Sequence, residues 1–111
     1  MSKDNLKYIF ILLVFAVLTA SANFAYSQQE NDLQKAYDLL NTGNSDLALP
    51  IFESYAKENP TDTKIYLQIA YVYQQKKNFE KAKENFNYVI GNSKNDEEIT
   101  SAKKSLDYLR E

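Results

Sequence analysis

The sequence contains no cysteine, no histidine and no tryptophan, and it has only two glycines and two prolines. Without cysteine and histidine the chain has no thiolate nucleophile, no imidazole base and no ordinary ligand set for zinc, haem or an iron–sulfur cluster. Two glycines are too few for a dinucleotide fingerprint or a phosphate-binding loop, since each brings several backbone positions close to phosphate. We therefore predict no catalytic, cofactor-binding or metal-binding residues.

The net charge and the length of the chain further narrow the class of protein. The 111 residues include 13 basic and 15 acidic side chains, a net charge of −2, which gives no electrostatic footprint for nucleic acid. The densest basic stretch, residues 76–83, is interrupted by Glu80 and followed by Glu84, as on a solvated helix surface. We expect one small domain and no nucleic-acid partner.

Residues 1–27 have the layout of a secretory signal peptide. A short positive region at Lys3 and Lys7 precedes an uncharged apolar run, residues 8–18, and then a small and polar stretch. Small residues at suitable positions predict cleavage after Ala22 or after Ser27, and the second site is favoured because it also removes nearby aromatic residues.

Cleavage would leave residues 28–111 as a soluble domain, either periplasmic or secreted. The absence of cysteine fits an oxidising compartment, where a lone thiol is a liability, and it excludes lipid attachment at a lipoprotein site. The alternative is an uncleaved membrane anchor. The apolar run is shorter than the about 20 residues that a bilayer core needs, but Tyr8 to Tyr26 could span it if Asn23 lay in the interface. We expect membrane contact only in that case.

Beyond residue 27 the apolar residues recur at helical spacing. Three stripes are clear: Leu33, Ala36, Tyr37 and Leu40; Ala48, Phe52, Tyr55 and Ala56; Ile65, Ile69, Val72 and Tyr73. Residues that end helices are expected at Gly43, Pro60, Asn78 and Gly91, with Asn78 in the role of Gly43. Ser45 or Asp46 is expected to cap the second helix, which places Pro50 near its first turn. The pattern predicts helix, short turn and helix, repeated.

The pattern recurs at a fixed distance along the sequence, the distance from Ala36 to Ala70. We call this distance the repeat offset. The same offset pairs Leu39 with Tyr73, Ala48 with Ala82, Phe52 with Phe86, and Tyr55 with Val89. Small residues are replaced by small ones and large by large, which is what two closely crossing helices require. The sequence therefore predicts two copies of one helical hairpin.

These residues resemble the tetratricopeptide repeat family. Residues 63–94 supply its spaced aromatic and small positions as Tyr66, Ile69, Ala70, Tyr73, Phe79, Ala82 and Phe86. Residues 29–62 supply a weaker version as Ala36, Leu39, Ala48, Phe52 and Pro60. The resemblance implies an all-α solenoid of two hairpins, in a small exported bacterial protein. The four aromatic residues of the second repeat are expected to fill its core.

The two ends of the array differ from its middle. Three polar residues of the first repeat, Asn31, Lys35 and Asp38, stand at positions where the second repeat has apolar residues. We therefore expect the array to begin here, because a terminal repeat needs a polar outer face. The chain finishes on an apolar stripe at helical spacing, Ile99, Ala102, Leu106 and Leu109. It predicts a capping helix over about residues 96–110, whose acidic first turn is expected to be solvated rather than to bind calcium.

In the family, one face of each first helix lines a concave groove. The resemblance places eight residues on this candidate partner groove: Leu33, Tyr37, Leu40, Lys64, Leu67, Gln68, Tyr71 and Gln74. Tyr37 and Tyr71 share one repeat position, and tyrosine offers an apolar ring and a hydroxyl at low entropic cost. A protein or peptide partner would fit such a groove. The alternative is that these side chains only shield the core.

The sequence thus predicts a non-catalytic adaptor or scaffold that binds protein in the cell envelope after export. The alternative is a membrane-anchored assembly subunit with an uncleaved N-terminal helix. An enzyme is not expected, because acid–base work by carboxylates or tyrosines needs a buried pair with shifted pKa, and the acidic residues occupy predicted surfaces, caps and loops. Two repeats and one helix bury little surface, so we expect stabilisation by a partner or by a homo-oligomer.

Overall fold

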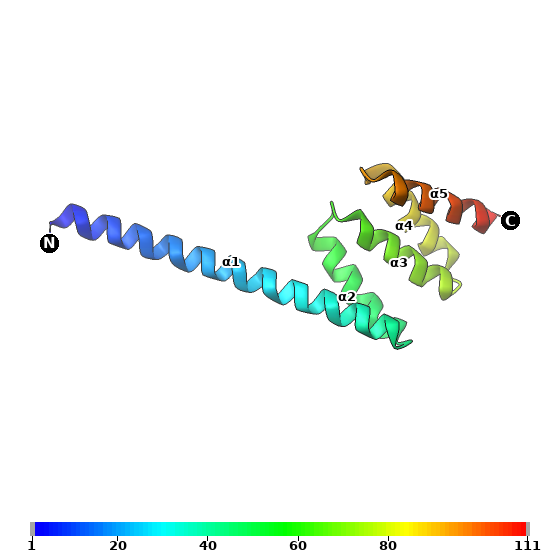
Figure 1. The fold of residues 1–111 in the computed structure, drawn as a ribbon, viewed down its shortest axis with the longest axis horizontal. Helices are drawn as coiled ribbons and strands as arrows, with labels where there is room; N and C mark the ends of the chain where they lie inside the picture. The colour runs from blue at the N-terminus through cyan, green and yellow to red at the C-terminus, as the bar shows by residue number, and fades with distance from the viewer. Residues whose placement is uncertain (1, 111) are drawn as a thin grey trace. The chain divides into compact units, whose positions relative to one another are not determined.

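The computed structural model describes residues 2–110, in which the regular structure is entirely α-helical. The helices are α1 (Lys3–Asn41), α2 (Ser45–Glu58), α3 (Thr63–Gln75), α4 (Phe79–Asn92) and α5 (Asp96–Arg110), as Figure 1 shows. The predicted all-α class is confirmed. The chain divides into two compact units, Met1–Asp32 and Leu33–Glu111, which we describe separately.

The first unit consists of the N-terminal part of α1. The helix continues through both predicted cleavage positions, Ala22 and Ser27, so no structural boundary appears at residue 27. Within it, the hydroxyl groups of Thr19 and Ser21 donate to backbone carbonyls one turn back, at 3.0 and 2.9 Å. This part of α1 is long and apolar enough to cross a membrane, a property that signal sequences share.

The second unit has two clusters of buried side chains. The first cluster joins the end of α1 to α2 and α3 and contains Ala36, Ala48, Leu49, Phe52, Ala56, Ile65, Ile69 and Val72. The second cluster joins α3 to α4 and α5 and contains Ala70, Ala82, Phe86, Val89, Ala102 and Leu106. Tyr66 and Tyr73 on α3 pack against both clusters. Helix α3 therefore connects the two cores.

The helices α1 and α3 end in the same backbone motif. After α1, the N–H groups of Gly43 and Asn44 donate to carbonyls three and five residues back, at 3.1 and 2.8 Å. After α3, Lys77 and Asn78 make the same two bonds at 3.0 and 2.9 Å. These paired bonds form a Schellman motif, which needs a left-handed residue, and φ is 82° at Gly43 and 60° at Lys77. The two turns are separated by the repeat offset.

The prediction that Asn78 takes the place of Gly43 was therefore wrong. Lys77 occupies the left-handed position, and Asn78 is the counterpart of Asn44, the residue before the next helix. Asparagine tolerates the left-handed region, but here its side chain has another role, since Asn78 Oδ1 accepts a hydrogen bond from the N–H of Lys81 at 3.3 Å. The repeat offset was a better guide than residue preference.

Two other helix ends also differ from expectation. Asn44, rather than Ser45 or Asp46, immediately precedes α2. Pro50 consequently lies in the second turn of α2, and the helix continues through it to Glu58. Helix α4 runs to Asn92, just beyond Gly91. Each helix end differs from the expected one by only one or two residues.

Glu98, in the first turn of α5, is half-buried and hydrogen-bonded within the second unit. Its Oε2 accepts hydrogen bonds from Thr63 Oγ1 and Ser93 Oγ, both at 2.6 Å. Thr63 is the first residue of α3 and only 7% exposed, so Glu98 ties the start of α5 to the start of α3. Asn95 caps the helix, since its Oδ1 accepts from the N–H of Glu97 at 2.9 Å. Of the three acidic residues expected to be solvated, Glu98 is half-buried and also bonds Thr63 and Ser93.

The strained turn at Lys77 generates a stability prediction. A left-handed conformation costs a side-chain-bearing residue about 1–2 kcal/mol, part of which glycine loses again through its greater freedom in the unfolded chain. Lys77→Gly should therefore raise the free energy of unfolding of the helical domain by about 0.5–1 kcal/mol, measured by urea denaturation followed by circular dichroism. The reciprocal change, Gly43→Ala, should lower it. A lower midpoint for Lys77→Gly would contradict the turn assignment.

The Glu98 contact generates a second prediction. Glu98→Ala removes the acceptor of the Thr63 hydroxyl, and leaving a buried donor unpaired costs about 1–3 kcal/mol. Glu97→Ala is the matched control, because Glu97 is exposed and precedes Glu98 in the same turn. Urea denaturation should show a clearly larger loss for Glu98→Ala. Equal losses of stability for Glu98→Ala and Glu97→Ala would mean that the bond to Thr63 adds nothing beyond the interaction of an acidic residue with the helix dipole.

Candidate functional site

The two predicted groove tyrosines occupy equivalent positions in the structure. The ring of Tyr37 meets that of Phe52 edge to face, with centroids 5.1 Å apart and planes at 76°. The ring of Tyr71 meets that of Phe86 in the same way, at 5.5 Å and 72°. Both phenylalanines are fully buried, and the two pairs are related by the repeat offset. Each tyrosine is therefore fixed by the core beneath it.

The remaining groove residues divide between the two clusters. On α1, Leu33 and Leu40 are half-buried against the first cluster, as is Tyr37. On α3, Leu67 and Tyr71 are half-buried against the second. The polar members, Lys64, Gln68 and Gln74, are respectively exposed, half-buried and half-buried. Every apolar residue of the predicted groove packs against a core cluster. These side chains therefore shield the core, as the alternative to partner binding expects.

Two of the predicted groove residues, Tyr71 and Gln74, line a cleft between α3 and α5. We call it the α3–α5 cleft; its volume is about 440 Å³ and it is lined by Tyr71, Gln74, Gln75, Lys77, Phe79, Ser105 and Tyr108. Phe79 is 44% exposed and Tyr108 is 69% exposed, so two aromatic rings at this cleft are open to solvent. Lys64, Leu67 and Gln68 lie outside it.

Sequence reasoning missed part of this cleft. Phe79 was expected in the core, but the Schellman turn at residues 76–78 starts α4 with its first side chain outside the second cluster. Ser105 and Tyr108 were not identified, because they lie off the apolar stripe that predicts α5. Tyr108 did offer a signal: it is a large aromatic residue among exposed charged neighbours.

Gln74 contributes an unusual polar group to the α3–α5 cleft. Its Oε1 is buried and has no hydrogen-bond partner within the described residues. A buried acceptor without a donor is costly, and such groups are rare in native structures. Lys77, which makes no ion pair within residues 2–110, also lines the cleft. The cleft thus combines exposed aromatic surface, a buried acceptor and a cation.

A second cleft lies between the α2–α3 connection and the start of α5. It measures about 640 Å³ and is lined by Pro60, Thr61, Thr63, Tyr88, Asn92, Ser93, Lys94, Asn95 and Glu98. Several of its polar groups already bind one another: Tyr88 donates to the carbonyl of Pro60 at 2.8 Å, and Glu98 accepts from two hydroxyls. Tyr88 also stacks on Tyr66, with centroids 4.0 Å apart. These contacts assign this cleft a structural role.

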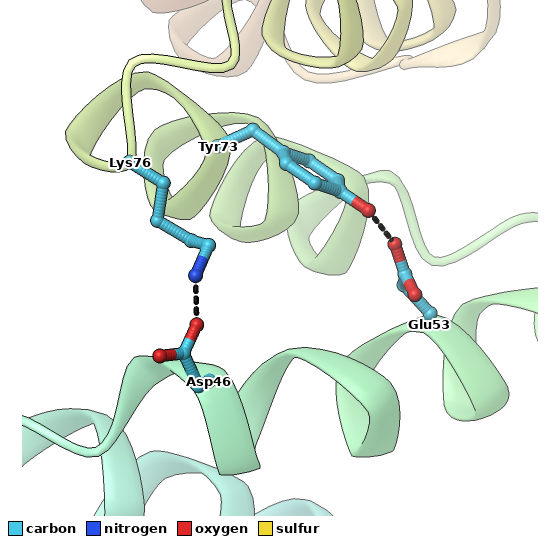
Figure 2. A network of polar contacts seen from close by, with 4 residues as sticks. All are labelled: Asp46, Glu53, Tyr73 and Lys76. Carbon is cyan, nitrogen blue, oxygen red and sulfur yellow. Dashed lines mark hydrogen bonds and ion pairs between the residues drawn. The ribbon is translucent and has the colours of Figure 1, made fainter.

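Two polar contacts join α2 to α3 and to the residue that follows it, as Figure 2 shows. Lys76 pairs with Asp46, and the hydroxyl of Tyr73 donates to Glu53. Burial first, and then the hydrogen bond to Glu53 and nearby carboxylate charge, raise the pKa of Tyr73 to about 12. Burial likewise raises the pKa of Tyr37 and of Tyr66. These tyrosines remain neutral at ordinary pH and serve as donors or packing groups.

The raised pKa of Tyr73 predicts a stability loss at alkaline pH. An unfolded tyrosine has a pKa of about 10, so the folded state favours the neutral phenol; that stability is fully present below about pH 10 and is lost as pH rises through about 12. Tyr73→Phe should lose less stability than the native chain over this range, measured as urea midpoints at several pH values. Tyr108→Phe, which removes an exposed phenol, is the control. Parallel pH profiles for native and Tyr73→Phe would refute the assignment.

Comparison with family models, curated proteins and solved structures found no match to this chain. The resemblance to tetratricopeptide repeats therefore depends on the residues and the offset described above. The repeated turns and the repeated tyrosine–phenylalanine pairs are properties of this structure itself.

Proposed function

We propose that residues 28–111 form a non-catalytic protein-interaction module of the tetratricopeptide type, a solenoid of two helical hairpins and a capping helix. Three features support the hairpin repeat: the Schellman turns at Gly43 and Lys77, the equivalent tyrosine–phenylalanine pairs, and the repeat offset that both share. The function itself is inferred mainly from one observation, which is that exposed aromatic rings and an unpaired buried acceptor gather at the α3–α5 cleft.

Binding is a better explanation of this cleft than catalysis. A catalytic site needs titratable groups placed together with their pKa values shifted toward the working pH. The tyrosines with raised pKa, Tyr37, Tyr66 and Tyr73, lie outside the α3–α5 cleft, and burial is the first cause of each shift. Each shift is also upward, away from neutral pH. The cleft instead offers the contacts that a protein or peptide chain can use.

The chemistry of the α3–α5 cleft indicates what such a partner presents. Phe79 and Tyr108 offer apolar area to an aliphatic or aromatic side chain. Gln74 Oε1 lacks a donor but is buried, so a partner's N–H reaches it only if the Gln74 side chain turns toward the cleft. Lys77 attracts a carboxylate. Exposed aromatic residues of this kind supply a large part of the binding energy at many protein interfaces.

We place this activity in the cell envelope, after export. The positively charged start, the apolar run and the small residues that follow it support export through the N-terminal segment. The long apolar part of α1 is consistent both with a signal peptide and with a membrane anchor. The adaptor role does not depend on which of these the segment is.

Affinity capture from envelope extracts tests the binding site. A chain with Phe79→Ser and Tyr108→Ser should lose the partners that the native chain captures, because both substitutions remove exposed apolar surface from the cleft. Leu47→Ser is the matched control: Leu47 is 61% exposed on α2, outside the cleft. Circular dichroism should show the same helix content for all three chains.

Two outcomes would contradict the proposal. If every partner survives the double substitution, the cleft is not the binding site. If Leu47→Ser removes the same partners, the captured proteins recognise exposed apolar residues in general. These exposed positions are better probes than Tyr37 and Tyr71, whose removal would disturb the core contacts with Phe52 and Phe86.

A further inference from the structure

The uncharged part of α1 is longer than its most apolar run. Residues 8–29, between Lys7 and Glu30, carry no charged side chain, and all of them are helical. At a rise of about 1.5 Å per residue they extend about 33 Å, against a hydrocarbon core of about 30 Å. The apolar region of a signal peptide is about 7–15 residues long. The apolar run alone, residues 8–18, falls within that range, but the whole uncharged helix is long enough to cross a bilayer.

The backbone and two of the hydroxyl groups in this stretch are hydrogen-bonded within the helix. A membrane span must bond its backbone internally, and α1 does so without a break from Lys3 onward. The hydroxyls of Thr19 and Ser21 donate to the carbonyls of Ala16 and Val17 at 3.0 and 2.9 Å, which is how these residues are accommodated in apolar surroundings. Neither hydroxyl needs water as a partner.

Aromatic and charged residues mark the two ends of the uncharged stretch. Tyr8 and Tyr26 are separated by about 27 Å along a helix, which is close to the spacing of the two membrane interfaces where tyrosine is enriched. Lys3 and Lys7 lie just before Tyr8, and the first charge after Tyr26 is the acidic Glu30. Two lysines lie close to the N-terminal end, whereas the first basic residue after Tyr26 is Lys35, and this excess sets the orientation, with the end that carries Lys3 and Lys7 in the cytoplasm.

We infer that residues 8–29 bind a lipid bilayer as a permanent single-span anchor, with Lys3 and Lys7 on the cytoplasmic side and residues 33–110 on the opposite side. This departs from the cleavage favoured by sequence patterns. Ala22 and Ser27 lie inside an uninterrupted helix, and cleavage after Ala22 would remove part of the span itself. The inference concerns the first unit and does not rest on the proposed binding function.

Fractionation of cells that express the full chain tests the anchor. The intact mass should include residues 1–27, and the chain should stay in the membrane pellet after an alkaline carbonate wash. A variant with Ala20→Leu, Ala22→Leu, Ala25→Leu and Ser27→Leu, which blocks both cleavage positions, should behave identically. A chain beginning at Asn23 or Gln28, or a full-length chain released by carbonate, overturns the inference.

The absence of cysteine allows a direct test of orientation. Ser2→Cys and Lys103→Cys each introduce one thiol, at exposed positions before α1 and on α5. A membrane-impermeant maleimide should label Lys103→Cys in intact spheroplasts and Ser2→Cys only after lysis. Labelling of Ser2→Cys in intact spheroplasts overturns the orientation. If the labelling result overturns the anchor, the capture experiment with the Phe79 and Tyr108 variants is unaffected. The anchor and the proposed binding site can therefore fail independently.

Discussion

Close approach of helices at alanine is the constraint on which the second unit depends. Ala36, Ala48, Ala70 and Ala82 are all fully buried, and Phe52 and Phe86 fill the space beside them. A larger side chain at any of these alanines would push two helices apart, and overpacking of this kind costs about 1–3 kcal/mol. The tyrosine rings depend on the same geometry, because Tyr37 and Tyr71 contact the buried phenylalanine rings edge on. Tyr71, held in this way, forms part of the wall of the α3–α5 cleft.

This constraint explains why so much of the fold could be predicted. Alternation of small and large residues at helical spacing is a local property, and it recurs at the repeat offset because the same packing recurs. The all-α class and the buried alanines and phenylalanines follow from it directly. The left-handed turn at Lys77 was not predicted: residue preference favoured Asn78, although Lys77 is the residue that lies at the repeat offset from Gly43.

The features that sequence did not predict depend on contacts between distant segments. Glu98 looked like a helix-dipole charge, and only its contact with Thr63, far earlier in the chain, turns it inward. Phe79 fits a core position of the repeat, yet it faces a cleft that needs α5 to exist. Tyr108 and the unpaired oxygen of Gln74 likewise acquire meaning only when α3 and α5 are placed together. This part of the candidate site was therefore beyond prediction from local patterns.

Anchoring and binding would reinforce each other. A domain with two small cores has little stability to spare, and any partner that binds only the folded state adds stability in proportion to the logarithm of its concentration over the dissociation constant. A span such as residues 8–29 would confine the domain to one membrane, where a partner in the same membrane is present at a raised effective concentration. A modest cleft with two exposed rings could then suffice, because confinement supplies part of the apparent affinity that a freely diffusing adaptor would need from its interface alone.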